Sequence, residues 1–312
     1  VFLMDVAMRI TLKQLEVFIA VAQSGSVTRA AEGLNITQSA TSMSLSDFET
    51  QLGRKLFDRV SKRLQLNDSG RLLLPKALDA IARVSEIESM AASDAPLIGQ
   101  LHIGASLTIG NYMLPGLIGS FMRNHAGAHI TLDVANTRHV IEALKQFQVD
   151  IGFIEGFCHE PDIEAIPWCR DELVVFAAAN HPLATQQTVT SADLADADWI
   201  LREPGSGTRE IFDNAVLGRL PRIKLLMEFS HTEALKRAVE TGIGIGCASR
   251  RTLDEALING SVVVLPTPFL DLERQLFLLI HRQKYRTQGL EAFLTHCRQA
   301  FPSQSFAPPP HQ

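Results

Sequence analysis

The chain changes its pattern of apolar residues once, near Gly99, and this change limits the folds that it can adopt. Before that point apolar residues recur mostly at helical spacing. After it, short apolar runs alternate with helical segments, which is typical of βαβ units and parallel sheets. These runs are QLHIGA, HITLDVA, VDIGFIE, LVVFAAA, DWILRE, IKLLMEFS, IGIGCAS and SVVVLP. The sequence therefore predicts an α/β region behind a smaller helical one.

Residues 8–66 are predicted to form a winged helix-turn-helix. A first amphipathic helix ends at Gly25, Ser26 caps a short second helix, and a third helix runs from Thr37 to a stop at Gly53. The segment KLFDRVSKRLQLN then alternates like two short strands around a basic turn. In such a unit the first turns of the third helix meet base edges in the major groove. The alternative is a generic three-helix cap whose polar surface is simply solvated.

Polar and basic side chains crowd the third helix and the wing. Gln38 can pair with adenine through two hydrogen bonds, and wing cations can neutralise phosphates. The candidate DNA contacts are Ser26, Arg29, Thr37, Gln38, Ser39, Thr41, Ser42, Arg59, Lys62 and Arg63. A net charge of −5 argues against a chain that coats nucleic acid over its whole surface, but it allows one basic module.

Residues 67–93 are predicted to form a long linker helix that dimerises. Asn67 caps this helix, and its apolar stripe is too rich for an isolated helix in water. We expect Leu78 and Ile81, which lie on the stripe, to be buried between two chains. Pro75 should kink the early turns.

Several features exclude other classes of protein. The cysteines have neither metal-ligand nor CxxC spacing, so we expect them to be reduced and mostly buried, with a thiol sensor as the alternative. They are Cys158, Cys169, Cys247 and Cys297. The first residues do not read as a signal peptide and no long apolar stretch follows, so we expect a cytoplasmic protein without a membrane partner. HExxH and GxxxxGK[ST] are absent, and we expect no metal, no cofactor and no enzyme activity.

Residues 12–75 resemble the amino-terminal domain of LysR-type transcriptional regulators. The AA pair, the TQSA helix start, the LE…LG..LF.R run and the L…G..L linker start all occur in order. GASLTIGNYMLP, VDIGFIEG, REPGSGTRE and GIGIGCASR are similar to the effector domain of the branch with sulfite-responsive and carbon-fixation regulators. The sequence departs from the pattern at Met43, where many members carry Arg or another long polar residue.

The resemblance implies a periplasmic-binding-protein-like effector domain of two Rossmann-like subdomains around a cleft. Residues 99–167 and 267–301 would form subdomain I, and residues 168–266 would form subdomain II. It also implies partners: double-stranded DNA with an interrupted inverted repeat in a promoter, a homotetramer built as a dimer of dimers, and RNA polymerase as a further candidate.

Hydroxyl and amide groups at four strand-to-helix junctions could converge on a small anion in this cleft. Unpaired N–H groups and the helix dipole favour anions at helix starts. The candidate effector contacts are Ser106, Thr108, Asn136, Thr137, Glu155, Gly205, Ser206, Gly207, Thr208, Arg209, Ser230 and Thr232. Each hydroxyl or amide could also do no more than cap a helix, and Arg209 could pair with Asp213. Glu155 could accept from a ligand hydroxyl or from a cleft amide.

Taken together, these features predict a sequence-specific DNA-binding regulator whose activity changes when a small anion closes the cleft. The GSGTR loop contains no Lys, which argues against a polyphosphate and for sulfite, sulfate or a small carboxylate. Metabolites of carbon fixation remain open. A solute-binding protein or a two-subdomain enzyme could use the same cleft. The first would need a secretion signal and no DNA-binding domain, and residues 1–66 contradict both, while the missing catalytic groups disfavour the second.

Overall fold

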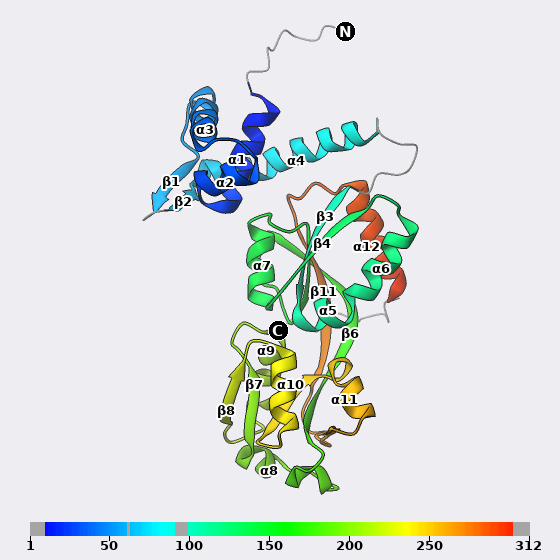
Figure 1. Ribbon diagram of the computed structural model, residues 1–312. Helices are drawn as coiled ribbons and strands as arrows, with labels where there is room; N and C mark the ends of the chain where they lie inside the picture. The colour runs from blue at the N-terminus through cyan, green and yellow to red at the C-terminus, as the bar shows by residue number, and fades with distance from the viewer. Residues whose placement is uncertain (1–9, 61–62, 91–98, 302–312) are drawn as a thin grey trace. The chain divides into compact units, whose positions relative to one another are not determined.

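The computed structural model describes residues 10–60, 63–90 and 99–301 (Figure 1). They fall into two compact units, which divide near Gly99. The amino-terminal unit contains α1 (Leu12–Ser24), α2 (Val27–Gly33), α3 (Gln38–Leu52), β1 (Phe57–Val60), β2 (Arg63–Leu66) and α4 (Asp68–Met90). Lys62 of the predicted wing lies outside the described residues.

Local capping explains where the first helices begin and end. Thr11 forms a capping box with Gln14 at the start of α1, and the Thr37 hydroxyl accepts from the backbone N–H of Ala40 at the start of α3. Gly25 and Gly53 end α1 and α3 at φ values of +64° and +65°, which glycine adopts without a steric penalty. The helices, the β1–β2 hairpin and α4 enclose one core around Phe18 and other buried apolar residues.

Helix α4 is only partly covered by this core. Leu74 is buried against the core, whereas Leu78 and Ile81 are partly buried against the same cluster within one chain. The sequence analysis did not predict these contacts within the chain, because it placed both residues in an interface between two chains. Leu72 and Ile87 stand 70% and 66% exposed.

The carboxy-terminal unit is an α/β domain built on one mixed sheet, in the order β4-β3-β5-β11-β6-β9-β7-β8 with β10 beside β6. Its strands are β3 (Gln100–Ser106), β4 (His129–Ala135), β5 (Ile151–Glu155), β6 (Ile163–Ala178), β7 (Asp198–Arg202), β8 (Lys224–Phe229), β9 (Ile245–Ser249), β10 (Val262–Val264) and β11 (Glu273–His281). Its helices are α5 (Leu107–Tyr112), α6 (Leu114–Asn124), α7 (Thr137–Lys145), α8 (Ser191–Asp196), α9 (Gly207–Val216), α10 (Thr232–Glu240), α11 (Asp254–Ile258) and α12 (Gln288–Ala300), with 3-10 turns at Pro182–Thr185 and Arg250–Thr252.

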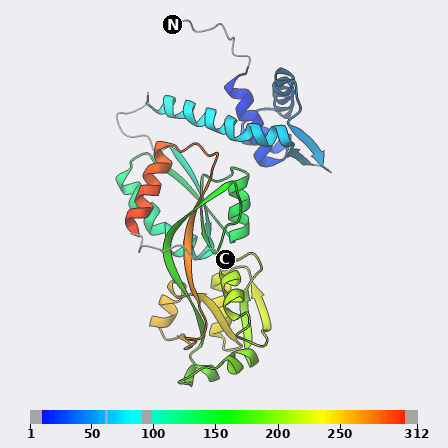
Figure 2. The same cartoon turned by 180° about the vertical axis from the view of Figure 1, so that it is seen from behind.

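Two long strands join the two halves of this sheet. β3, β4 and β5 are parallel and form subdomain I, and β7, β8 and β9 are parallel and form subdomain II. β6 pairs with β9 and β10 of the second half and with β11, while β11 runs antiparallel to β5 and β6 and returns the chain to subdomain I (Figure 2). The sheet is therefore mixed, because these crossover strands run against their neighbours.

The described residues contain no helix that is long and apolar enough to span a membrane. Burial raises the pKa of the Cys169, Cys247 and Cys297 thiols to about 12. Since the thiolate is the reactive form, these three side chains are poorly suited to redox sensing. Burial also raises the pKa of Cys158, which is less deeply buried.

Candidate functional site

The exposed face of α3 carries polar side chains near its amino-terminal end. Gln38, Ser39 and Ser42 are exposed, and Thr37 is exposed while it caps the helix. Thr41 does not belong to this surface: it is fully buried, and its hydroxyl donates to the Thr37 carbonyl oxygen at 3.0 Å. The expectation of a DNA contact at Thr41 overlooked that this position faces the core.

Basic side chains are exposed on other elements of the same unit. Arg59 and Arg63 are exposed on the β1–β2 hairpin, and Arg29 is exposed on α2. Ser26 caps α2 by accepting from the backbone N–H of Arg29, and the Arg29 guanidinium donates to the Ser24 carbonyl oxygen. The amino-terminal unit thus exposes hydrogen-bonding groups on one helix and cations on α2 and the hairpin, the two kinds of group with which proteins contact base edges and the charged backbone of a duplex.

In the carboxy-terminal unit, the junctions after β3 and β7 meet between the two subdomains. Ser106 stands at the amino-terminal cap of α5 and Ser206 at that of α9, but neither side chain makes a capping hydrogen bond within the described structure. They are 1% and 2% exposed, and among the described residues their hydroxyl oxygens have no hydrogen-bond partner. Capping alone therefore does not explain these serines, because an unpaired buried hydroxyl costs free energy.

A buried ion pair connects the two junctions. Arg274 of β11 donates to the hydroxyl oxygen of Thr208 at 3.0 Å and to that of Thr108 at 3.3 Å, one from each subdomain. Its guanidinium also pairs with Asp171 of β6 at 2.6 Å, and Asp171 in turn accepts from Ser249 at 2.8 Å. Sequence reasoning missed Arg274 and Asp171. In the sequence, each of them is a charged residue next to an apolar run, and this was the one feature that could have pointed to them. The structure pairs the two positions directly across β6 and β11.

Direct hydrogen bonds also hold the subdomains together. The backbone N–H of Gly207 donates to the Thr137 hydroxyl at 3.2 Å, and the Thr137 hydroxyl donates to the Glu155 carbonyl oxygen at 3.2 Å. A Cβ atom on Gly207 would lie 2.1 Å from that same carbonyl oxygen. Gly207 therefore lets α9 approach subdomain I, whereas the sequence interpretation had placed a ligand against it.

Glu155 already has a partner in the cleft. Its carboxylate accepts from the backbone N–H of Thr108 at 3.0 Å, and its side chain is almost completely buried. The sequence offered two roles for Glu155, a bond from a ligand hydroxyl or a bond from a cleft amide, and the structure contains the second. The carboxylate thereby occupies one of the N–H groups at the start of α5.

Some predicted effector contacts have other partners. Arg209 pairs with Asp213 at 2.9 Å, and Ser230 is exposed. Asn136 caps α7 through His139 and reaches Glu203 of subdomain II at 3.1 Å. The expected direct contacts of Arg209 and Ser230 with a buried ligand are therefore not supported by this geometry.

Thr232 and Gly205 belong to further contacts of subdomain II. The Thr232 hydroxyl accepts from Arg202, a buried residue whose guanidinium pairs with Glu203 at 2.8 Å. The Gly205 carbonyl oxygen accepts from the backbone N–H of Arg138 at 3.2 Å and so forms one more bond between the subdomains. Sequence reasoning also missed Arg202 and Arg138.

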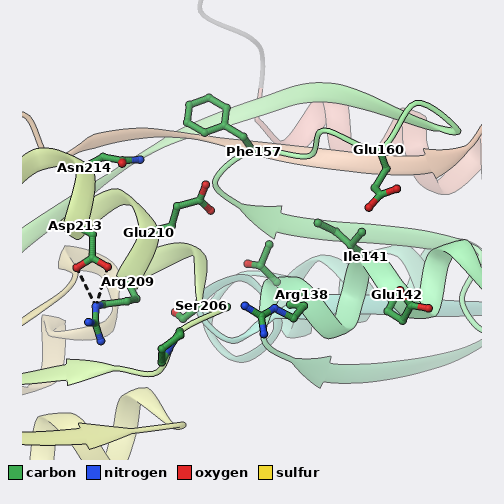
Figure 3. Close-up of a pocket in the computed structure, with 13 residues that line it drawn as sticks. Arg138, Ile141, Glu142, Phe157, Glu160, Ser206, Arg209, Glu210, Asp213 and Asn214 are labelled. Carbon is green, nitrogen blue, oxygen red and sulfur yellow. Dashed lines mark hydrogen bonds and ion pairs between the residues drawn. The ribbon is translucent and has the colours of Figure 1, made fainter.

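A cavity of about 530 Å³ opens between α7 and α9 (Figure 3). Phe157 and Ile141 provide apolar lining, while Arg138 and Glu210 provide charged groups. Burial raises the pKa of the Glu210 carboxyl, although the charge of His159 acts in the opposite direction. Figure 3 also shows Arg209 turned toward Asp213.

Comparison with family models places the two units in one family. Residues 12–71 match the bacterial regulatory helix-turn-helix protein model of the LysR family, and residues 94–302 match the LysR substrate binding domain. The chain is 48% identical to the uncharacterized HTH-type transcriptional regulator YeiE of Escherichia coli strain K12, over 93% of this chain and 98% of the relative. It is 31% identical to the HTH-type transcriptional regulator CysL of Bacillus subtilis, over 93% and 97%.

Solved structures are similar over the same parts. A full-length variant of OxyR from Pseudomonas aeruginosa has a TM-score of 0.74 at 22% identity and covers 96% of this chain and 99% of its own. The regulatory domain of CcmR from Synechocystis PCC6803, in complex with 2-PG, has a TM-score of 0.62 at 25% identity, over 66% and 99%. The first likeness concerns the fold of the whole chain, and the second concerns the carboxy-terminal unit.

Proposed function

The chain belongs to the LysR family of DNA-binding transcriptional regulators, and from that premise we propose that a compact oxyanion bound between Ser106 and Ser206 controls its activity. Its named relatives are regulators and not enzymes, and the carboxy-terminal unit is its effector-binding domain. Sulfite, sulfate and a small carboxylate are the ligand classes that we consider. The CcmR domain in complex with 2-PG supports a small ligand in this kind of domain.

The observation that carries the proposal is the pair of unpaired hydroxyls. Ser106 and Ser206 come from opposite subdomains, both are buried, and both lack a partner among the described residues. An oxyanion can accept one hydrogen bond from each hydroxyl and so satisfy both groups at once. A bond to a charged acceptor contributes about 1.5–3 kcal/mol, more than a bond between neutral groups.

The charges around the two hydroxyls favour a ligand that keeps an acidic proton. Arg274 supplies a cation at the base of the cleft, but Asp171 neutralises it. Glu155 places a carboxylate at the start of α5. A ligand such as hydrogen sulfite can donate its proton to Glu155 while its other oxygens accept from the serines, so it should bind more tightly than sulfate or acetate, which carry no acidic proton near neutral pH.

Ligand entry requires the subdomains to separate, because both hydroxyl oxygens are shut off from solvent. The bonds from Gly207 to Thr137 and from Arg138 to Gly205 would break in that step. A ligand shifts the equilibrium between open and closed arrangements only as far as its affinity for the two differs. Bridging Ser106 and Ser206 would favour the closed arrangement.

Titration calorimetry on the full-length protein tests this proposal. Sulfite, sulfate and acetate would be titrated into the wild type and the Ser106→Ala, Ser206→Ala and Ser120→Ala variants. Loss of one charge-assisted bond should weaken binding about 10- to 100-fold in either clamp variant. Ser120 bonds the Leu117 carbonyl oxygen away from the clamp, so its variant should bind normally. Unchanged affinity in both clamp variants would refute the site.

We further propose that α4 pairs with α4 of a second copy of the chain. Two such dimers would form a tetramer that binds an interrupted inverted repeat in a promoter. RNA polymerase is a candidate partner there. The exposed Leu72 and Ile87 support the pairing. Ile87→Glu should lower the mass measured by sedimentation velocity. Ile258→Glu, at an 88% exposed position on α11, is the matched control. An unchanged mass for Ile87→Glu would contradict this interface.

A further inference from the structure

The polar face of α3 contains one large apolar side chain. Met43 is 64% exposed, and the residues around it on this face, Ser39, Ser42 and Ser46, are exposed as well. The apolar residues Leu45 and Phe48 of the same helix are buried in the core. A single exposed apolar side chain needs no function by itself. Met43 differs because it stands on the face that our site assignment directs toward base edges.

The major groove offers one kind of apolar group to such a side chain. Adenine, guanine and cytosine present hydrogen-bonding atoms there, whereas thymine adds a C5-methyl group. Methionine has an unbranched and flexible side chain that can adapt to a small apolar target. It has no charged group and so cannot pair with a phosphate. We propose that Met43 contacts the C5-methyl group of a thymine in each half-site and so helps to determine sequence specificity.

The neighbours of Met43 make this contact selective. Ser39 lies one turn before Met43 on the helix, and Ser42 directly precedes it. Hydroxyls accept many base edges, since they can both donate and accept. The methyl contact would therefore add discrimination that the serines cannot provide. Gln38, which can pair with adenine, lies farther toward the start of α3.

This inference rests on the expectation from the sequence that α3 enters the major groove. The experiment separates the two ideas by removing only the methyl group from the DNA. A duplex is first selected from a random library of short duplexes with the full-length wild type. Each thymine is then replaced, one at a time, by deoxyuridine, which keeps the hydrogen-bonding atoms and lacks the C5-methyl group. Fluorescence anisotropy gives the affinity of every duplex for the wild type, Met43→Ala, Met43→Leu, Gln38→Ala and Met122→Ala.

One thymine in each half-site should lose about fourfold in affinity for the wild type when its methyl group is removed, as expected for burial of one methyl group. Met43→Ala should bind the deoxyuridine and thymine duplexes equally at that position. Met43→Leu should keep most of the difference, and Met122→Ala, at a 44% exposed position on α6, should behave as the wild type does.

The same loss at every thymine in the wild type and in Met43→Ala would overturn the methyl contact. If Gln38→Ala retains its specificity at the same time, the groove assignment itself fails. If Gln38→Ala loses specificity, only the role of Met43 fails. Because Met43 is exposed, its replacement should leave the thermal unfolding transition unchanged, so that altered DNA binding does not reflect loss of the fold.

Discussion

Ser42 on α3 and Ser206 at the start of α9 are chemically identical, but the fold treats their hydroxyl groups in opposite ways. Ser42 is exposed, so water can satisfy its hydroxyl in the absence of DNA. Ser206 is buried and has no partner among the described residues. If DNA binds to α3 as proposed, that surface needs no rearrangement. If an anion binds between the serines as proposed, it reaches the unsatisfied hydroxyl only after the subdomains move, which would couple binding to a change of shape.

Substitutions should therefore have different consequences in the two regions. A change on the exposed face of α3 or on the wing should alter DNA binding and leave stability nearly unchanged. A change in the buried cleft should alter stability and ligand binding together, because the same bonds that hold the subdomains surround the site.

The largest effect is expected for Arg274→Ala. The substitution leaves Asp171 buried without its main partner, and breaking a buried ion pair in this way costs about 3–5 kcal/mol. Urea unfolding of the full-length protein would measure it. Arg63→Ala on the exposed wing is the matched control and should change the free energy of unfolding by less than about 0.5 kcal/mol. Equal stability of the two variants would remove the distinction between the regions.

Gly207→Ala should have the next largest effect. Its new Cβ would lie 2.1 Å from the Glu155 carbonyl oxygen, so the subdomains must separate. We expect a loss of about 3 kcal/mol, at the upper end for overpacking, together with weaker oxyanion binding. Gly33→Ala on α2 is the control, because its new Cβ would have no described atom within 4 Å. If Gly207→Ala unfolds at the same temperature as the wild type, the cleft is not closed in solution.

Gln38→Ala should affect DNA and spare stability. Loss of a base contact should cost about 1–3 kcal/mol on the preferred duplex and relax the sequence preference. Arg63→Ala should instead weaken all duplexes alike and reduce the salt dependence by about one unit of slope. Anisotropy titrations at several salt concentrations distinguish the two effects. An unchanged ratio of specific to random binding in Gln38→Ala would place the groove contact elsewhere.

The smallest effect concerns the pH dependence of stability. Burial raises the pKa of Glu210 in the folded protein, so the folded state holds its proton more tightly than the unfolded state. Glu210 therefore lowers stability as pH rises through its folded pKa, and this penalty disappears below the unfolded value. Glu210→Gln should stabilise the protein at neutral pH by a few tenths of a kcal/mol at most, on the order of a screened surface interaction. Urea unfolding at several pH values would measure this gain, and a larger gain at acidic pH would reverse the sign.

The parts of the molecule that local chemistry determines were predictable. Ser26 caps α2 as expected, the third helix begins next to Thr37, and Gly25 ends α1 in the left-handed conformation. The alternation of strands and helices after Gly99 predicted the α/β domain. These features depend on residues within about one helical turn of each other.

The parts that depend on distant residues were not predictable. Arg274 and Asp171 are 103 positions apart, and the sequence does not reveal that the two strands pair with these residues in register. The burial of Thr41 depends on how α3 packs against the rest of the amino-terminal unit. Gly207 looked like a ligand-facing glycine because the carbonyl oxygen that it approaches belongs to another strand. Local pattern identified the cleft junctions, but the tertiary fold decided which of their groups remain unsatisfied.

The return of β11 to subdomain I has a consequence for the order of synthesis. β11 pairs with β5 between Leu276 and Glu155, positions that leave the ribosome 121 residues apart. At a synthesis rate of about 5–20 residues per second, roughly 6–24 s pass between the synthesis of β5 and that of the β11 residues that pair with it. Subdomain II, in contrast, has all of its strands once Val264 has emerged, because β6 to β10 are synthesised by that point. The half of the sheet that is synthesised first is therefore completed last, and a nascent chain exposes the β5 edge throughout that interval.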